Sequence, residues 1–186
     1  VPGVQNTLYL NDGLGGFVDV TATHLPQVVD WTGAVALGDI DHDGDLDIFF
    51  GNGQGQASRL CANDGTGHFT DVSAAQLPPM TRTIYCAKMV DIDHDGDLDI
   101  VAREKVLVND GLGFFTDVSS TNAPPGTVNA WGMAVGDVNG DSHVDVMFGI
   151  NSNTVQPVLW LNDGTGVFTN ASANLPSAVY VGGDFQ

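Results

Sequence analysis

The chain has 186 residues, with 5 Lys and Arg against 23 Asp and Glu, so its formal net charge is −18 at pH 7. That balance excludes a nucleic-acid binder, because phosphate contacts need clustered Lys and Arg. The 24 Gly and 8 Pro disfavour a helical bundle, and no apolar run reaches the roughly 18 residues of a membrane helix, so we expect no membrane insertion.

A repeated hairpin motif opens the chain. Residues 8–13 read Leu-Tyr-Leu-Asn-Asp-Gly, and Asn, Asp and Gly tolerate the positive φ of tight turns between strands. The motif returns at residues 60–65, 106–111 and 159–164, and its asparagine advances by 52, 46 and 53 residues. Aspartate-rich runs beginning at Asp39, Asp91 and Asp137 advance by 52 and 46 residues. Two unrelated motifs recur at the same intervals, so the chain is an array of one repeat of about 50 residues.

Each complete repeat is predicted to hold four short strands. In the first repeat, residues 33–40 and 46–52 flank the aspartate run, and residues 58–64 and 68–73 form the hairpin. Along the first strand, bulky residues lie on one face and small residues on the other. Successive sheets can therefore stack with the bulky face of one against the small face of the next. Four-stranded sheets repeated radially make a propeller, so we expect an all-β fold, a β-propeller with about three and a half antiparallel blades. The alternative is an open sandwich of duplicated hairpins, which has no reason to repeat the same loop chemistry.

The predicted units follow one another without a linker domain. They are the third and fourth strands of an incomplete blade at 1–22, blades at 31–73, 83–120 and 129–172, and the first strand of a further blade at 177–186. Asp184 would be the first ligand of an unfinished site. We expect a piece of a longer protein or, less favoured, self-association of copies to complete the ring, because a missing inner strand leaves unpaired edges.

The aspartate runs have the chemistry of calcium loops. Ca²⁺ takes six to eight oxygens, and alternate carboxylates on a tightly curled loop can point at one centre. When the first Asp of each run is counted as position 1, side-chain oxygens fall at positions 1, 3, 5 and 9. Position 7 would contribute its backbone carbonyl oxygen. One ion is expected in each complete blade, and the predicted ligands are Asp39, Asp41, Asp43, Asp45 and Asp47, then Asp91, Asp93, Asp95, Asp97 and Asp99, then Asp137, Asn139, Asp141, His143 and Asp145. Ser142 replaces the turn glycine of the third loop, so weaker binding is expected there.

Two other interpretations of the runs are less favourable. An EF-hand needs a bidentate Glu at position 12, where this chain has Phe50, Ala102 and Phe148. Bare turns would leave uncompensated repulsion of about 1 kcal/mol per carboxylate pair at 4 Å, even in bulk water. Imidazole is a poor calcium ligand, so His42 and His94 at position 4 are expected to face solvent.

The loop sequences carry a family resemblance. "GDIDHDGDLDI", "VDIDHDGDLDI" and "GDVNGDSHVDV", followed by Asn-Asp-Gly hairpins, resemble FG-GAP/VCBS repeats, the blades of integrin α-subunit propellers and of many secreted bacterial proteins. The sequence of the hairpin and the segment after it, "NDGTGHFTDVSAAQLP", is more similar to the bacterial repeats. The resemblance implies calcium between the first two strands of each blade and about seven blades in an integrin-type ring. It supplies no ligand pocket, because no Arg-Gly-Asp sequence is matched.

These features together predict a calcium-stabilised β-propeller that is extracellular or at the cell surface. We expect a binding or adhesion module for an unidentified protein or glycan partner. No catalytic constellation is visible, so an enzyme is not expected. The alternative is the propeller portion of a secreted carbohydrate-active enzyme, of the polysaccharide lyase type, with its catalytic groups outside this chain.

The remaining polar features have modest interpretations. Cys61 and Cys86 are too few for a disulfide scaffold or a zinc ribbon, and buried free thiols are favoured over a bridge between adjacent blades. All five Lys and Arg lie between residues 59 and 105. Pairing with nearby carboxylates is favoured over one basic spot.

Overall fold

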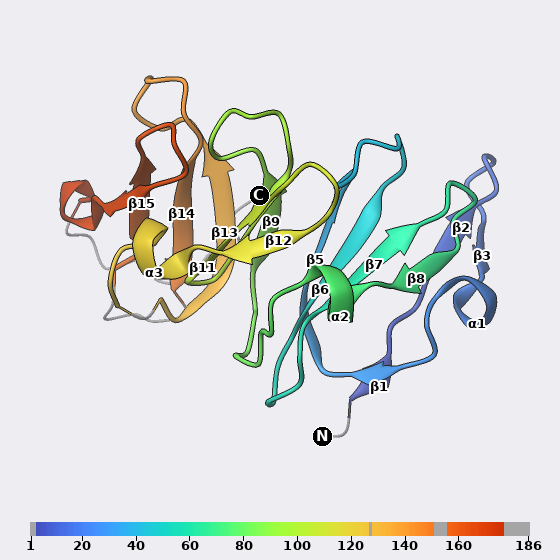
Figure 1. Cartoon of the computed structure of the whole chain (residues 1–186). Coiled ribbons are helices and arrows are strands. Elements are labelled where there is room, and N and C mark those ends of the chain that lie inside the picture. Colours follow the sequence, from blue (N-terminus) through green and yellow to red (C-terminus); the bar gives the residue numbers. More distant parts are fainter. Residues whose placement is uncertain (1–2, 127, 151–155, 177–186) are drawn as a thin grey trace.

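The fold is an array of antiparallel sheets, seen in a computed structural model that describes residues 3–126, 128–150 and 156–176 (Figure 1). Three sheets have four strands each, and within each sheet the strands follow chain order. The first sheet holds β5 (Thr32–Gly38), β6 (Asp47–Asn52), β7 (Arg59–Asn63) and β8 (Phe69–Asp71). The second holds β9 (Ala87–Val90), β10 (Asp99–Ala102), β11 (Lys105–Asn109) and β12 (Phe115–Asp117). The third holds β13 (Ala130–Gly136), β14 (Asp145–Ile150), β15 (Val158–Asn162) and β16 (Phe168–Asn170).

A two-stranded sheet precedes these three. It pairs β2 (Tyr9–Asn11) with β3 (Phe17–Asp19), at the position of a third and fourth strand. The all-β prediction is confirmed, and the architecture is that of successive propeller blades in an incomplete ring. The predicted first strand at residues 177–186, with Asp184, lies outside the described residues.

The core lies between neighbouring sheets, with small residues opposite large ones. Ala36 on β5 belongs to one buried cluster with Ala87 and Ile100 of the next sheet. Gly38 lets the next sheet approach closely, because a Cβ at this residue would lie 2.7 Å from Leu98 Cδ1 and 2.9 Å from the sulfur of Met89. The next interface is built around Trp160, which is 1% exposed. The alternation along the first strand therefore sets how the sheets stack.

A short helix follows each fourth strand, which the sequence analysis did not predict. These are α1 (Thr21–His24), α2 (Ser73–Gln76), α3 (Ser119–Asn122) and the 3-10 turn η1 (Ser172–Asn174). In the first complete sheet, Asp71 Oδ1 accepts a hydrogen bond from Ser73 N at 3.0 Å, and Ser73 Oγ accepts one from Leu60 N at 2.8 Å. Asp-Val-Ser in the first two complete sheets, and Asn-Ala-Ser in the third, thus make the same local side-chain bonds to the backbone after the fourth strand.

One pairing has no counterpart in the predicted elements. β1 (Val4–Gln5) lies antiparallel to β4 (Val29–Asp30), with Val4 opposite Asp30. Two-residue strands are too short for an alternating pattern to reveal them. None of the helices in the described ranges is long and apolar enough to cross a membrane.

Candidate metal centre

The three aspartate runs form loops at one rim of the array, which we call the aspartate rim (residues 39–46, 91–98 and 137–144). They connect the first and second strands of each sheet, at the top of the view in Figure 1. Strand register fixes their ends, because Gly38 pairs with Asp47 and Val90 with Asp99. The Asn-Asp-Gly turns between third and fourth strands lie at the same rim.

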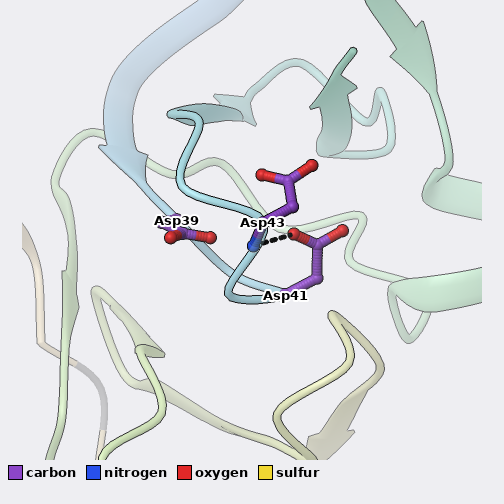
Figure 2. A group of neighbouring side chains, drawn as sticks. All are labelled: Asp39, Asp41 and Asp43. Atoms are coloured by element: carbon purple, nitrogen blue, oxygen red, sulfur yellow. Dashed lines mark hydrogen bonds between the residues drawn. The ribbon is translucent and has the colours of Figure 1, made fainter. Parts of the chain in front are cut away.

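The first loop brings three predicted ligands together. Asp39, Asp41 and Asp43 each offer a carboxylate oxygen, and these oxygens lie within 4.8 Å of one another (Figure 2). Asp41 Oδ1 accepts a hydrogen bond from Asp43 N at 3.3 Å, and Asp39 Oδ2 accepts one from Gly44 N at 3.1 Å. Asp39 Oδ1 is buried and has no hydrogen-bond partner among the described residues. A buried anionic oxygen without a partner is costly unless a cation neutralises it.

The second loop gathers Asp91, Asp93 and Asp99 within the same distance. Asp93 Oδ1 is again buried and without a partner in the described part of the chain. Burial raises the pKa of Asp93, and the neighbouring Asp95 raises it further. Burial also raises the pKa of Asp99, to about 7. Carboxylates are therefore crowded here at a cost that a bound cation would remove.

The ninth residue of each loop also holds the backbone. Asp47 Oδ2 accepts a hydrogen bond from Ile40 N at 3.0 Å, and Asp47 Oδ1 accepts one from Asn63 N at 2.8 Å. Asp99 and Asp145 make the same two kinds of bond, to Ile92 and Asn109 and to Val138 and Asn162 respectively. Each carboxylate joins its loop to the third strand and is at most 1% exposed. Of the three, only Asp99 lies within a group of clustered carboxylates.

Side chains at position 7 lie over the hairpin turn of their own sheet. A Cβ at Gly65 would lie 2.5 Å from Asp45 Oδ2, and one at Gly111 would lie 2.6 Å from Asp97 Oδ2. The ring of His143 stands in the same place over Gly164. These side chains are not part of the clustered carboxylates. Asp95 is not part of its cluster either. Coordination by the position 7 carbonyls stays a prediction.

In the third loop, the carboxylates of Asp137 and Asp141 accept hydrogen bonds from N–H groups of the loop itself. Asp137 accepts four backbone N–H groups, and the bond from Ser142 N, at 2.9 Å, contributes most to lowering the pKa of Asp137. Asp141 Oδ2 accepts a hydrogen bond from Asn139 Nδ2 at 2.7 Å. Within residues 137–145, no three acidic or histidine side chains come within 4.8 Å of one another. This loop therefore needs a cation less than the other two.

All three loops share one backbone pattern. Positions 4 and 6 have positive φ: 62° and 91° in the first loop, 65° and 95° in the second, and 84° and 72° in the third. Histidine precedes glycine in the first two loops, whereas the third has Gly140 and then Ser142. Ser142 thus adopts the left-handed conformation that glycine serves elsewhere, at a steric cost.

Two contacts between neighbouring loops were missed by the sequence analysis. Asn109 Nδ2 donates to Ile40 O of the preceding sheet at 2.8 Å, and Asn162 Nδ2 donates to Ile92 O at 2.7 Å. The strict repetition of Asn in every hairpin was the available signal. His42 and His94 are exposed, as expected, but each also contacts the next loop: His42 contacts Asp97, and His94 contacts the carbonyl of Ser142.

The first two loops fit a hard cation. Their clustered donors are all oxygen, and the soft donors Cys61 and Cys86 lie in other clusters. One carboxylate oxygen in each of these loops is buried without a partner in the described ranges. Both thiols are free, and burial raises their pKa to about 12 and about 11. Such a loop can bind a divalent cation and fix two strands of a blade.

Comparison with known proteins agrees with the loop sequences. The sequence profile of the FG-GAP-like repeat matches residues 3–50 and 41–102. Cartilage acidic protein 1 of Xenopus tropicalis is 32% identical over 100 residues, which is 51% of this chain. The chain spans 15% of the length of that relative. FG-GAP repeats are typical of extracellular proteins and generally form a non-catalytic binding fold. The chain belongs to the FG-GAP-like repeat family.

Proposed function

We propose that this chain is a calcium-stabilised, extracellular β-propeller segment that acts as a binding or adhesion module for a protein or carbohydrate partner. One observation carries the proposal: Asp39 Oδ1 and Asp93 Oδ1 are buried without partners among the residues that the structure describes, each inside a group of clustered carboxylates. Family membership supports the binding role. The net charge of −18 supports the need for cations.

The first two loops would hold the ions most firmly. Asp39, Asp41 and Asp43 would bind one ion, and Asp91, Asp93 and Asp99 another. The third loop would bind more weakly, because its backbone N–H groups already compensate Asp137. Extracellular modules of this kind work with dissociation constants of about 10⁻⁴–10⁻³ M, so millimolar calcium suffices.

Ion binding would reach beyond the loop. Each loop joins two strands of one sheet, and Asn109 ties the first loop to the hairpin of the next sheet. An ion that orders residues 39–47 therefore stabilises packing between blades, and its binding free energy adds to folding stability. The loops at the opposite rim are left for partner recognition.

Thermal unfolding in calcium and in chelator tests this proposal. We expect the midpoint to fall on chelation, and the chelator effect to shrink in the Asp39→Asn and Asp91→Asn variants. Asp64→Asn is the matched control, since it removes one charge from the same rim and keeps the oxygen that accepts the Thr66 N–H. An unchanged midpoint after chelation would contradict the proposal.

The enzyme alternative stays a prediction with its own assay. In that alternative the catalytic groups lie outside this chain, so the assay uses a longer protein that contains it. Such a protein would release unsaturated sugars from uronate polymers if it were a polysaccharide lyase. We expect no release above a heat-denatured control.

A further inference from the structure

Three aromatic residues from three successive sheets meet at the rim opposite the aspartate rim. Trp31 precedes β5, Tyr85 precedes β9 and Trp131 lies at the start of β13. The rings of Tyr85 and Trp131 are stacked, with centroids 4.6 Å apart and planes 6° apart. Trp31 meets Tyr85 edge-on at 6.2 Å. We call these three residues the aromatic row.

Trp131 is exposed although its ring is large, and Trp31 and Tyr85 are half-buried. Trp131 is 54% exposed, whereas Trp160, in the core, is 1% exposed. Tyr85 backs one face of the Trp131 ring, so an approaching molecule meets a rigid, flat apolar surface. Tyr and Trp give large contact areas at a low cost in conformational entropy, which makes such rings effective binding groups.

An arginine that is largely covered by its neighbours holds the row in place. Arg103 lies at the tip of the β10–β11 turn with φ of 55°, and its side chain is 13% exposed. Its guanidinium donates to Thr83 O at 2.8 Å and to Val128 O at 2.7 Å. Thr83 is two residues before Tyr85, and Asn129, which accepts a third bond at 3.2 Å, is two residues before Trp131. One side chain thus fixes both segments that carry the stacked rings.

Hydrogen bonds from the turn after β6 hold the backbone of Trp31. Gly53 N donates to Trp31 O at 2.8 Å, and the side-chain oxygen of Gln56 accepts from Trp31 N. Ile84 N donates to Asn52 O at 3.0 Å, which joins this turn to the segment before Tyr85. The row is therefore preorganised by hydrogen bonds across two neighbouring sheets.

The charges on this side of the array are balanced. Arg82 and Arg103 pair with Glu104, at 2.6 and 3.0 Å, and Lys105 pairs with Asp117 at 2.5 Å. Arg59 pairs with both Asp30 and Asp71, at 2.5 and 2.6 Å, so that four cations face four carboxylates. The unbalanced aspartates are concentrated at the opposite rim. A strongly charged ligand gains little here, which favours a neutral one.

Neighbouring groups supply hydrogen bonds and little further apolar surface. The exposed Asn129 and Gln54 flank the row, and Gly53 and Gly132 add no apolar side chain. A hollow of about 150 Å³ on the same side is lined by Thr81, Arg82, Lys105 and three apolar residues. A flat ring with polar groups at its margin matches a pyranose, whose C–H face is apolar and whose edge carries hydroxyls.

From this geometry we propose that the aromatic row is a binding site for neutral oligosaccharides, with a sugar ring on the exposed face of Trp131. This rests on the proposed binding function and names its ligand class. Trp131 supplies the apolar contact, Tyr85 backs it, and Arg103 is a positioning residue.

Direct binding measurements test this site. The calcium-loaded chain is titrated with cellohexaose, maltohexaose, laminarihexaose and chitohexaose while tryptophan emission is recorded. We expect at least one to bind with a change in emission, and Trp131→Ala to weaken it at least tenfold. Trp131→Phe should retain part of the affinity, and Phe114→Ala, which removes a 46% exposed ring at the aspartate rim, should leave it unchanged.

Three outcomes would overturn the site: no binding of any of the four sugars, binding that Trp131→Ala leaves intact, or Trp131-dependent binding of a protein in place of a sugar. Arg103→Lys separates positioning from folding. It should weaken sugar binding and alter the emission of the free chain while calcium still raises the unfolding midpoint. Sugar binding together with an unfolding midpoint that chelator does not move would remove the calcium role and leave this site standing.

Discussion

His42 Nε2 lies 2.6 Å from Asp97 Oδ1, so the first aspartate loop contacts the second across 55 residues of sequence. His94 repeats the contact one sheet later, with Nε2 3.2 Å from Ser142 O and its ring against that of His143 at 4.9 Å. In both cases position 4 of one loop meets position 7 of the next, and in the second case it also meets position 6. The hydrogen bond to Asp97 raises the pKa of His42. The loops are therefore linked to one another as well as to their own strands.

A double-mutant cycle on this pair measures the link. His42→Ala should lower the unfolding midpoint of the calcium-loaded chain by only a few degrees, because both side chains are partly in water. Asp97→Asn should do the same, and the double variant should lose less than the sum of the two. Additive losses would show that the two loops are independent.

Asn109 is expected to contribute more than the equivalent Asn11. Asn109 Nδ2 donates to Ile40 O and Leu98 O, and Asn109 is 4% exposed. Asn109→Ala leaves buried carbonyls without a donor, so urea unfolding should show a loss of about 2 kcal/mol. Asn11→Ala is the control, since Asn11 is exposed and its side chain accepts only the Gly13 N–H among the described residues. Equal losses would refute the inter-sheet role.

Ser142 and Gly96 offer a reciprocal pair of substitutions at position 6. Ser142 has φ of 72°, a conformation that costs a residue with a Cβ about 1 kcal/mol relative to Gly. Ser142→Gly should therefore stabilise the chain slightly, and Gly96→Ser, at φ of 95°, should destabilise it. Chemical denaturation of both variants checks the signs, and a stabilising Gly96→Ser would contradict the assignment.

Much of the fold could be predicted because its signals are periodic. The Asn-Asp-Gly hairpins, the aspartate runs and the alternation along the first strand located all twelve strands of the three complete sheets. The β1–β4 pair escaped, since two residues carry no period. The helical turns after Asp71 and its equivalents escaped because they depend on a side-chain bond and not on hydrophobic pattern.

The candidate site was predictable in composition and less so in geometry. Alternation of Asp at 39, 41 and 43 places their carboxylates together, as expected. The backbone role of Asp47, the orientation of Asp45 over Gly65 and the inter-sheet bond of Asn109 depend on contacts between segments distant in sequence. No local pattern specifies such contacts.

Acid should remove the contribution of Asp117. Burial alone would raise the pKa of Asp117, but Lys105 and Ser119 outweigh it and hold the pKa below the usual 3.8. A carboxyl with a lowered pKa in the folded state stabilises the fold above pH 4, and this contribution is lost as pH falls through the folded pKa.

Asp117→Asn in chelator tests this pH dependence. The variant should be less stable than the parent chain at pH 7, and the difference should shrink towards pH 3. Urea unfolding at both pH values measures it. An equal difference at the two pH values would show that charge plays no part.

Calorimetric titration of the demetallated chain with CaCl₂ measures calcium binding by the aspartate loops directly. We expect two saturable sites with dissociation constants of about 10⁻³ M or tighter, plus a weaker third at the loop of Asp137. Asp39→Asn and Asp91→Asn should each weaken or remove one of the two stronger sites, and Asp64→Asn should remove none. Absence of saturable binding up to about 10 mM calcium, ten times that dissociation constant, or binding that neither loop variant reduces, would contradict this expectation.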